Sequence, residues 1–472
     1  MSKIAITKKD IIWSYVAQFF NIGSGLITLP LILHMLSSAE IGMNYLMITI
    51  STMVGLLDFG FAPQFARNIT YVFAGAHELR KEGVAEAQDV IDYELLANMI
   101  GVAKRVYTIL SLVTLILMVS VGTWYIYYVT DGFTNVHNSL YIWLLYSLSV
   151  FFNIYYVYYS SLLTGRGMVM EAKKAMIAQK LSYLILTFTL LLSGLGLLGV
   201  VLANIISPFV GRYLSYRYFY NHEMKENLSS VAKDVKKQTQ LFKTIWYNSK
   251  KLGLVFLGSY AINKLGMFFA GLYLSLEEVA SYGLMIQLVS IISSTAITVN
   301  TAIQPQLAAL RAEGEKQMLI TRFAFAMNIF YILNFVGTAF LFFCGPWILS
   351  LIGSNALLPS GIILFLYIIV VLLEYNHSAF ATFIVTSNNI PFVESSLLSG
   401  GAICLFSFLS LQFTNLGILG LVIVQGICQA TYANWKWPYV VCKEFHISFN
   451  QFLKIGLDES LKRLKIYGKS RN

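Results

Sequence analysis

The sequence has few charged residues. Only 12% of its 472 residues are Asp, Glu, Lys or Arg, whereas 57% are apolar, and an ordinary soluble domain carries about 25% charged residues. One soluble core cannot bury so much apolar surface, so lipid must be the solvent for most of the chain. The composition excludes a soluble globular protein and predicts an integral membrane protein.

Patterns that hold metals or form disulfides are also lacking. The four cysteines show no CxxC spacing and three lie inside or at the ends of apolar runs, so we interpret them as packing residues. The six histidines are scattered, without an HExxH motif or any paired spacing. The sequence therefore predicts no metal site and no cofactor.

Apolar runs long enough to cross a membrane recur along the chain. A hydrocarbon core of about 30 Å needs roughly 20 apolar residues per helix. The first run is about twice as long as a signal-peptide core and has no small-residue cleavage pattern, so we expect it to be a mature helix. We expect an all-α, polytopic membrane protein of about 12 transmembrane helices. The expected spans are residues 11–33, 43–62, 106–129, 139–163, 175–193, 196–216, 252–274, 283–304, 323–344, 360–385, 395–413 and 416–435.

Basic residues are missing from every second break between these spans. On this assignment, 32 of the 33 lysines and arginines fall on one side, and Lys264 is the exception. The positive-inside rule makes that side the cytoplasm, so both termini are expected there, in a bacterial inner membrane. The net charge of +10 then reflects topology and attraction to anionic lipid headgroups, and not a nucleic-acid partner.

Three pairs of segments in the same order indicate a duplicated six-helix unit. The pairs are SAEIGMNYLMI (38–48) with EEVASYGLMI (277–286), APQFAR (62–67) with QPQLAALR (304–311), and LGLLGVV (195–201) with LGILGLV (416–422). Because both copies start in the cytoplasm and hold an even number of helices, we expect parallel repeats around a central cavity. The expected parts are an N-terminal six-helix lobe (1–220), a basic cytoplasmic linker (221–251), a C-terminal six-helix lobe (252–435) and a basic cytoplasmic tail (436–472).

Lys264 is the sharpest functional signal. At 1.5 Å per residue it lies roughly 20 Å along its helix from the cytoplasmic pair Lys250 and Lys251. Its side chain cannot snorkel inward over that length, so we expect a charge that faces a water-filled cavity. A structural ion pair is the alternative.

Other polar side chains also interrupt apolar spans. Gln18 and Asn21 belong to a polar stripe on the first span, which either lines a cavity or joins helices by hydrogen bonds. Glu374 and His377 lie one turn apart near the middle of the tenth span. They form a candidate partner for Lys264, a proton site for ion-coupled transport, or a buried hydrogen-bonded pair.

Three charged residues lie at ends of spans. Asp58 and Arg67 frame the end of the second span, where Gly60 and Pro63 interrupt the helix. They could form a gate at the inner mouth or only cap helix ends. Arg311 ends the matching exit of the eighth span.

The chain resembles the polysaccharide flippases, O-antigen type in particular, of the multidrug/oligosaccharidyl-lipid/polysaccharide exporter superfamily. The resemblance covers nearly the whole length. Its carriers are LDFGF (57–61) followed by Arg67, the Asn263-Lys264 pair before EEVASY (277–282), and the exit at 305–311. An acidic stretch at 78–94, longer than the family pattern leads us to expect, is a departure.

The resemblance implies a cationic central cavity that receives an anionic, polyprenyl-pyrophosphate-linked oligosaccharide, with basic Lys264 in the seventh helix. It implies translocation to the outer leaflet by alternating access, without enzymatic chemistry, with H⁺ or Na⁺ as candidate coupling ions. The implied partners are this lipid-linked substrate, membrane lipids and other polysaccharide assembly proteins.

Three alternatives stay open beside the flippase. A drug or cation antiporter of the same superfamily would rely on cavity carboxylates. A membrane glycan polymerase or ligase would normally need a large outer loop, whereas the outer breaks here, such as 130–138 and 345–359, are short and free of Lys and Arg. A scaffolding protein would leave Lys264 unexplained.

Overall fold

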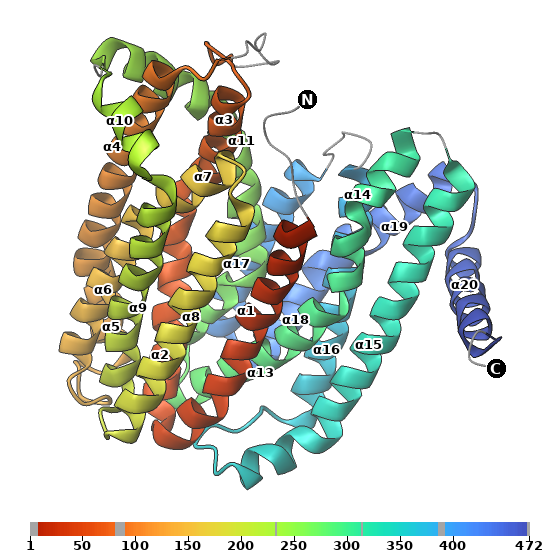
Figure 1. Cartoon of the computed structure of the whole chain (residues 1–472). Coiled ribbons are helices and arrows are strands. Elements are labelled where there is room, and N and C mark those ends of the chain that lie inside the picture. The colour runs from red at the N-terminus through yellow and green to blue at the C-terminus, as the bar shows by residue number, and fades with distance from the viewer. Residues whose placement is uncertain (1–7, 81–89, 232–233, 313–314, 386–391, 470–472) are drawn as a thin grey trace. The chain divides into compact units, whose positions relative to one another are not determined.

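Helices make up most of the described part of the chain. The computed structural model describes residues 8–80, 90–231, 234–312, 315–385 and 392–469, apart from some side chains in α1, α11, α14, α16 and α20. These residues contain helices and no strand (Figure 1). The chain divides into two compact units, Met1–Leu257 and Gly258–Asn472.

The N-terminal unit contains the helices up to and including most of α11. They are α1 (Lys8–Met35), α2 (Ser38–Gly55), the 3₁₀ turn η1 (Leu56–Asp58), α3 (Phe61–Phe73), α4 (Tyr93–Leu117), the π-helical turn η2 (Met118–Gly122), α5 (Thr123–Val129), α6 (Ser139–Tyr155), α7 (Val157–Gly165), α8 (Val169–Leu192), α9 (Gly196–Phe219), α10 (His222–Ser229) and α11 (Val235–Asn263).

The C-terminal unit begins inside α11 and holds the remaining helices. They are α12 (Leu265–Tyr273), α13 (Leu276–Ala296), α14 (Thr298–Ala312), α15 (Lys316–Leu351), α16 (Gly361–Val385), α17 (Val393–Phe413), α18 (Gly417–Ala430), α19 (Ala433–Glu444) and α20 (Phe449–Lys469).

Ten stretches of the described residues are long and apolar enough to cross a membrane. They are Ser38–Asp58, Tyr93–Val129, Ser139–Gly165, Val169–Leu192, Gly196–Phe219, Leu276–Asn300, Lys316–Leu351, Gly361–Ile384, Val393–Phe413 and Gly417–Glu444. The first expected span lies in α1, and the seventh is divided between α11 and α12. The chain is a polytopic all-α membrane protein.

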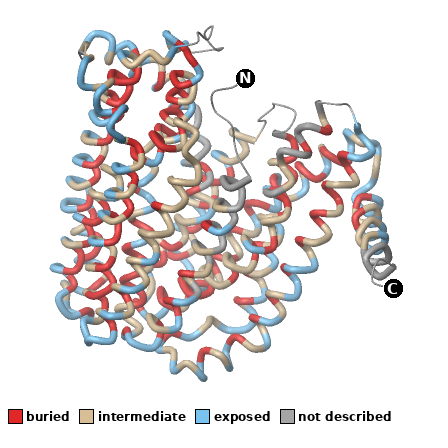
Figure 2. The backbone as a smooth tube through the Cα atoms, viewed as in Figure 1, coloured by how far each residue is buried: buried red, intermediate tan, exposed pale blue. Residues whose placement is uncertain are grey.

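Large apolar side chains on the outside of the helices fit a lipid solvent. On α15, Phe335, Phe343 and Trp347 are 73%, 78% and 65% exposed. In water this would be an unusually large apolar surface, whereas in a bilayer it faces hydrocarbon chains. Figure 2 shows exposed positions alternating with buried ones along this helix.

The start of the second helix is built alike in both units. Ser37 accepts a hydrogen bond from the backbone N–H of Glu40 at 3.3 Å, and Glu40 accepts one from the N–H of Ser37 at 2.9 Å. Ser275 and Glu278 form the same reciprocal capping box before α13. Each box satisfies two N–H groups that a helix end leaves without partners, so the repeat extends to atomic detail.

The turn before the sixth helix is also repeated. Gly196 (φ +53°) and Gly417 (φ +54°) stand at the first positions of α9 and α18. Both glycines have a left-handed backbone that other residues adopt only with strain. The matching segments in the sequence therefore mark equivalent turns.

The expected second span, 43–62, is wrong as a single helix. The α-helix α2 ends at Gly55, and Phe59 (φ +45°) and Gly60 (φ +73°) turn the chain before α3 begins at Phe61. Two consecutive left-handed residues cannot continue a right-handed helix.

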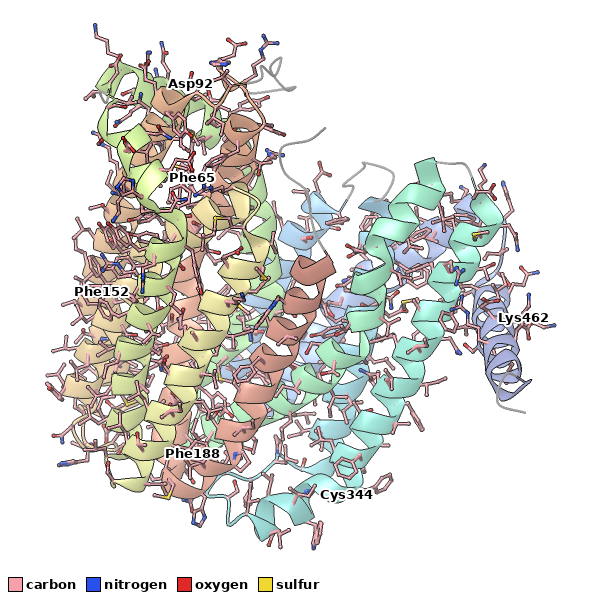
Figure 3. All side chains as sticks on the ribbon, viewed as in Figure 1. Phe65, Asp92, Phe152, Phe188, Cys344 and Lys462 are labelled. Carbon is pink, nitrogen blue, oxygen red and sulfur yellow. The ribbon has the colours of Figure 1, made fainter. Side chains whose placement is uncertain are left out.

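The expected linker and tail are largely helical. Residues 221–251 contribute to α10 and α11, and residues 436–472 contribute to α19 and α20. Part of the acidic stretch organises the start of α4. Asp92 accepts a hydrogen bond from the N–H of Leu95 at 2.8 Å (Figure 3), and Glu94 pairs with Lys237 of α11. The hydrogen bond that Lys237 donates to Glu94, together with the negative charge of Glu94, raises the pKa of the exposed Lys237 ammonium.

Candidate functional site

Lys264 stands at a break in the seventh expected span. Its backbone (φ −129°, ψ −23°) leaves the helical region between α11 and α12, although its N–H still donates to the carbonyl of Tyr260 at 2.8 Å. Lys264 is half-buried and the preceding Asn263 is exposed. Among the described residues, no carboxylate lies within ion-pair distance of the Lys264 ammonium.

Glu374 and His377 belong to a polar cluster that joins α16, α18 and α19. The amide of Gln429 donates to Oε2 of Glu374, and Nε2 of His377 lies 3.8 Å from the same oxygen. Nδ1 of His377 lies 2.9 Å from Oδ1 of Asn434. That contact calls for a proton on Nδ1, so His377 donates there and its Nε2 is not needed as a donor.

The described partners of Glu374 are thus Gln429 and His377, and Lys264 is not one of them. His377 is 8% exposed and Gln429 is fully buried. Within the described residues, the amide oxygen of Gln429 has no hydrogen-bond partner.

Asp58 caps the helix that follows it. Its Oδ2 accepts a hydrogen bond from the N–H of Ala62 at 3.2 Å in the first turn of α3, and its Oδ1 accepts one from the hydroxyl of Tyr107 at 2.6 Å. Tyr107 comes from α4, so Asp58 ties three segments together. Arg67 donates to Gln64 of the same helix at 2.5 Å.

Arg311 fixes the end of α14 against α19. Its guanidinium contacts the two carboxylate oxygens of Glu444 at 2.5 and 3.4 Å and lies 5.0 Å from the ring centre of Phe383. The remaining two candidates, Gln18 and Asn21, lie on α1, and their side chains fall outside the described residues.

Two cations within the spans of the N-terminal unit were not among the predicted site residues. Lys180 was grouped with the cytoplasmic basic residues, but it lies well inside the spanning helix α8 and is half-buried. Arg212 lies inside α9 and donates to the hydroxyl of Tyr156. Their positions within the expected spans 175–193 and 196–216 were a signal that grouping by loops concealed.

Metal ligands do not gather in the described residues, where no group of three or more His, Cys, Asp or Glu side chains could hold an ion.

Comparisons with known proteins identify the family and the fold. The family described as "Polysaccharide biosynthesis protein" matches residues 7–311. No significant match was found among curated protein sequences.

Three solved structures share the fold. The lipid II flippase MurJ in an inward closed conformation aligns with 13% identity and a TM-score of 0.66, covering 97% of this chain and 93% of MurJ. An inward-facing multidrug resistance MATE transporter of the MOP superfamily aligns with 14% identity and a TM-score of 0.62. The alignment covers 93% of this chain and 99% of the transporter. A mutant of the Vibrio cholerae MATE transporter VcmN aligns with 15% identity and a TM-score of 0.55. The alignment covers 93% of this chain and 97% of VcmN.

At these identities the likeness establishes the fold of MOP superfamily transporters, and the family match covers well over half of the chain. The chain belongs to the polysaccharide biosynthesis protein family.

Proposed function

We propose that this protein is a flippase that moves a polyprenyl-pyrophosphate-linked oligosaccharide, such as an O-antigen or another surface polysaccharide repeat unit, from the cytoplasmic to the outer leaflet. The family concerns polysaccharide biosynthesis, and a protein of the same fold is a lipid II flippase. The observation that carries the proposal is Lys264, a half-buried cation at a helix break inside an apolar span.

The charge of Lys264 needs a partner, because a lysine at the centre of a membrane helix costs about 3 kcal/mol to insert. The described carboxylates lie beyond ion-pair distance from it. A pyrophosphate supplies two negative charges and several acceptor oxygens at the point where a glycan joins its lipid. We therefore assign Lys264 to the recognition of this group.

The proposed mechanism is alternating access in a bacterial inner membrane, with both termini in the cytoplasm. The glycan and pyrophosphate enter a water-filled pathway while the polyprenyl chain stays in the bilayer, and the two units then move to open the pathway outward. The bonds of the substrate remain intact, so the protein only binds and releases it.

We propose H⁺ as the coupling ion, bound at the cluster of Glu374, His377 and Gln429. With Glu374 ionised, the amide of Gln429 donates to it. Once Glu374 is protonated, its hydroxyl can donate to the Gln429 oxygen after the amide rotates, which satisfies the atom that now has no described partner. Transport by Glu374→Gln that no longer responds to a pH gradient would support this role. Dependence on Na⁺ alone would contradict it.

The proposed function is tested in cells that lack their own flippase. The native chain is expressed in hosts with different lipid-linked glycans, and exposure of the glycan on the outer leaflet is measured together with the amount of protein in the membrane. Restored exposure in one host supports the flippase. Failure in every host, together with proton-dependent efflux of cationic drugs, would instead identify an antiporter of the same fold.

A further inference from the structure

The N-terminal unit contains a pocket between α6, α7, α8 and α9. Its volume is about 290 Å³. Figure 1 shows α8 and α9 side by side in this unit. All residues that line the pocket lie within one unit and within the described residues, so its geometry is independent of the C-terminal unit.

The pocket is cationic. Lys173 from α8 and Arg212 from α9 line it, together with neutral donors that include Gln179 and Ser215. None of the residues that line it is acidic. Within the described chain, neither Lys173 nor Arg212 lies in an ion pair with a carboxylate. Two half-buried positive charges without an acidic partner favour an anionic ligand.

Arg212 is held in place by an aromatic cluster. Its guanidinium lies 3.8 Å from the ring centre of Tyr156 and donates to the Tyr156 hydroxyl. Tyr156 follows directly after α6 and packs in turn on Phe152 (Figure 3) and Phe209, with ring centres 6.1 and 5.9 Å apart. An arginine positioned in this way loses little further freedom when it binds a planar or tetrahedral anion.

The residue before Arg212 is a glycine in close contact with α8. Gly211 lies against Gln179, and a Cβ at this position would come within 2.8 Å of the Gln179 amide oxygen. Gly211 therefore lets α9 approach α8 closely at the pocket wall. A larger residue here would displace Gln179, one of the donors of the pocket.

The size of the pocket suits a headgroup and not a glycan. Pockets for drug-sized ligands have volumes of about 300–1,000 Å³, so this one lies at the lower limit. It fits a phosphate or diphosphate with part of its ester, whereas an oligosaccharide repeat unit is too large for it.

The two cations of the pocket lie near the basic ends of their helices. Lys173 lies about 6 Å from the start of α8 at Val169, and Arg212 about 10 Å from the end of α9 at Phe219, at 1.5 Å per residue. These are the helix ends beside which basic residues gather. Phosphates of membrane lipids lie in the layer just outside a hydrocarbon core of about 30 Å.

We propose that the pocket of Lys173, Arg212, Gln179 and Ser215 binds the phosphate of a lipid headgroup in the leaflet at the basic ends of α8 and α9. Binding here goes beyond the proposed transport, because a lipid can occupy this pocket whether or not the protein flips it. The phosphate belongs either to an anionic phospholipid or to the diphosphate of a polyprenyl lipid, and the experiment separates the two.

The test is native mass spectrometry of the purified full chain in detergent. Phosphatidylglycerol, phosphatidylethanolamine and undecaprenyl diphosphate are titrated separately. The test variants are Lys173→Gln and the double variant Lys173→Gln/Arg212→Gln. The matched control is Lys174→Gln/Arg217→Gln, which removes the same charge from the same two helices at positions that do not line the pocket. Thermal stability in detergent verifies that each variant is folded.

We expect the double variant to bind phosphatidylglycerol, undecaprenyl diphosphate or both about 30-fold more weakly than the native chain, because each lost cation lowers the affinity about fivefold. The affinity of the control variant should change little. Loss for phosphatidylglycerol alone identifies a phospholipid site. Loss for undecaprenyl diphosphate alone identifies a site for the substrate's phosphates. If the double variant is unfolded, Lys173→Gln is compared with Lys174→Gln, and a loss of about fivefold is expected. Equal affinities of pocket and control variants for both lipids would overturn the proposal.

Discussion

The two units share a framework but differ in the polar groups that lie inside it. The capping boxes before α2 and α13 and the left-handed glycines that open α9 and α18 are equivalent. The seventh expected span breaks at Lys264, however, whereas α1, which holds the first expected span, continues from Lys8 to Met35. The repeat therefore preserves what positions the helices, and the units differ at the residues that we assign to function.

The passage from the second helix to the next segment also differs. In the N-terminal unit it turns through two left-handed residues and is held by Asp58. In the C-terminal unit Ile297 keeps a right-handed backbone (φ −76°, ψ −10°) between α13 and α14. A carboxylate is needed in the first passage because the left-handed turn leaves the N–H groups of α3 exposed.

Among variants that probe the difference between the two units, Asp58→Ala should lower the stability most. The variant loses the cap of α3 and leaves the Tyr107 hydroxyl without its acceptor, so the free energy of unfolding should fall by about 2–4 kcal/mol. Denaturation in detergent measures the change. Arg67→Ala on the same helix loses only the hydrogen bond to Gln64 and should cost less than about 1 kcal/mol. Equal losses would show that the cap of α3 contributes nothing specific.

The two left-handed glycines should differ when each is changed to alanine. Gly417→Ala should cost about 1–2 kcal/mol for its backbone alone, because the nearest atom to the new Cβ would be Leu274 Cδ2 at 3.7 Å. Gly196→Ala should cost about 1 kcal/mol more, because its Cβ would lie 2.9 Å from Oε1 of Glu40. Thermal unfolding of both variants gives the order, and a reversed order would contradict the assigned contact with Glu40.

The smallest difference in stability is expected between variants of the two capping boxes. Glu40 also accepts a hydrogen bond from the N–H of Leu197 at 3.2 Å, which links α2 to α9. Glu40→Gln keeps the volume but weakens both contacts and should cost about 1 kcal/mol. Glu278→Gln should cost about half as much, since its described bonds stay within its own box. A larger loss at Glu278 would reject this assignment.

Long apolar runs made the number and order of the membrane helices predictable. The repeated segments also predicted the duplicated unit, and the Ser37-x-x-Glu40 and Ser275-x-x-Glu278 spacing would have predicted the capping boxes. Gly60 and Pro63 did indicate an interruption of the helix, but the end of the second span was placed too late, at residue 62, whereas α2 ends at Gly55. The adjacent left-handed Phe59 depends on contacts that one sequence does not reveal.

The candidate residues were predictable as polar groups in apolar spans, but their partners were not. Gln429 and Asn434 lie 55 and 57 residues from Glu374 and His377, and tertiary packing alone brings them together. Lys180 and Arg212 were missed because positive residues were assigned to loops first and to helices second. The number of charges within each span is therefore the more useful signal.

The central claim is that the charge of Lys264 receives the anionic group of the substrate. The most direct measurement is the rate at which the purified protein, reconstituted in vesicles, flips a fluorescent polyprenyl-diphosphate glycan. We expect Lys264→Ala to lower the rate about 10- to 100-fold, as the loss of a charge-assisted contact predicts, and Lys264→Arg to retain most of it. Equal rates for the native protein and Lys264→Ala, at equal reconstituted amounts, would contradict the claim.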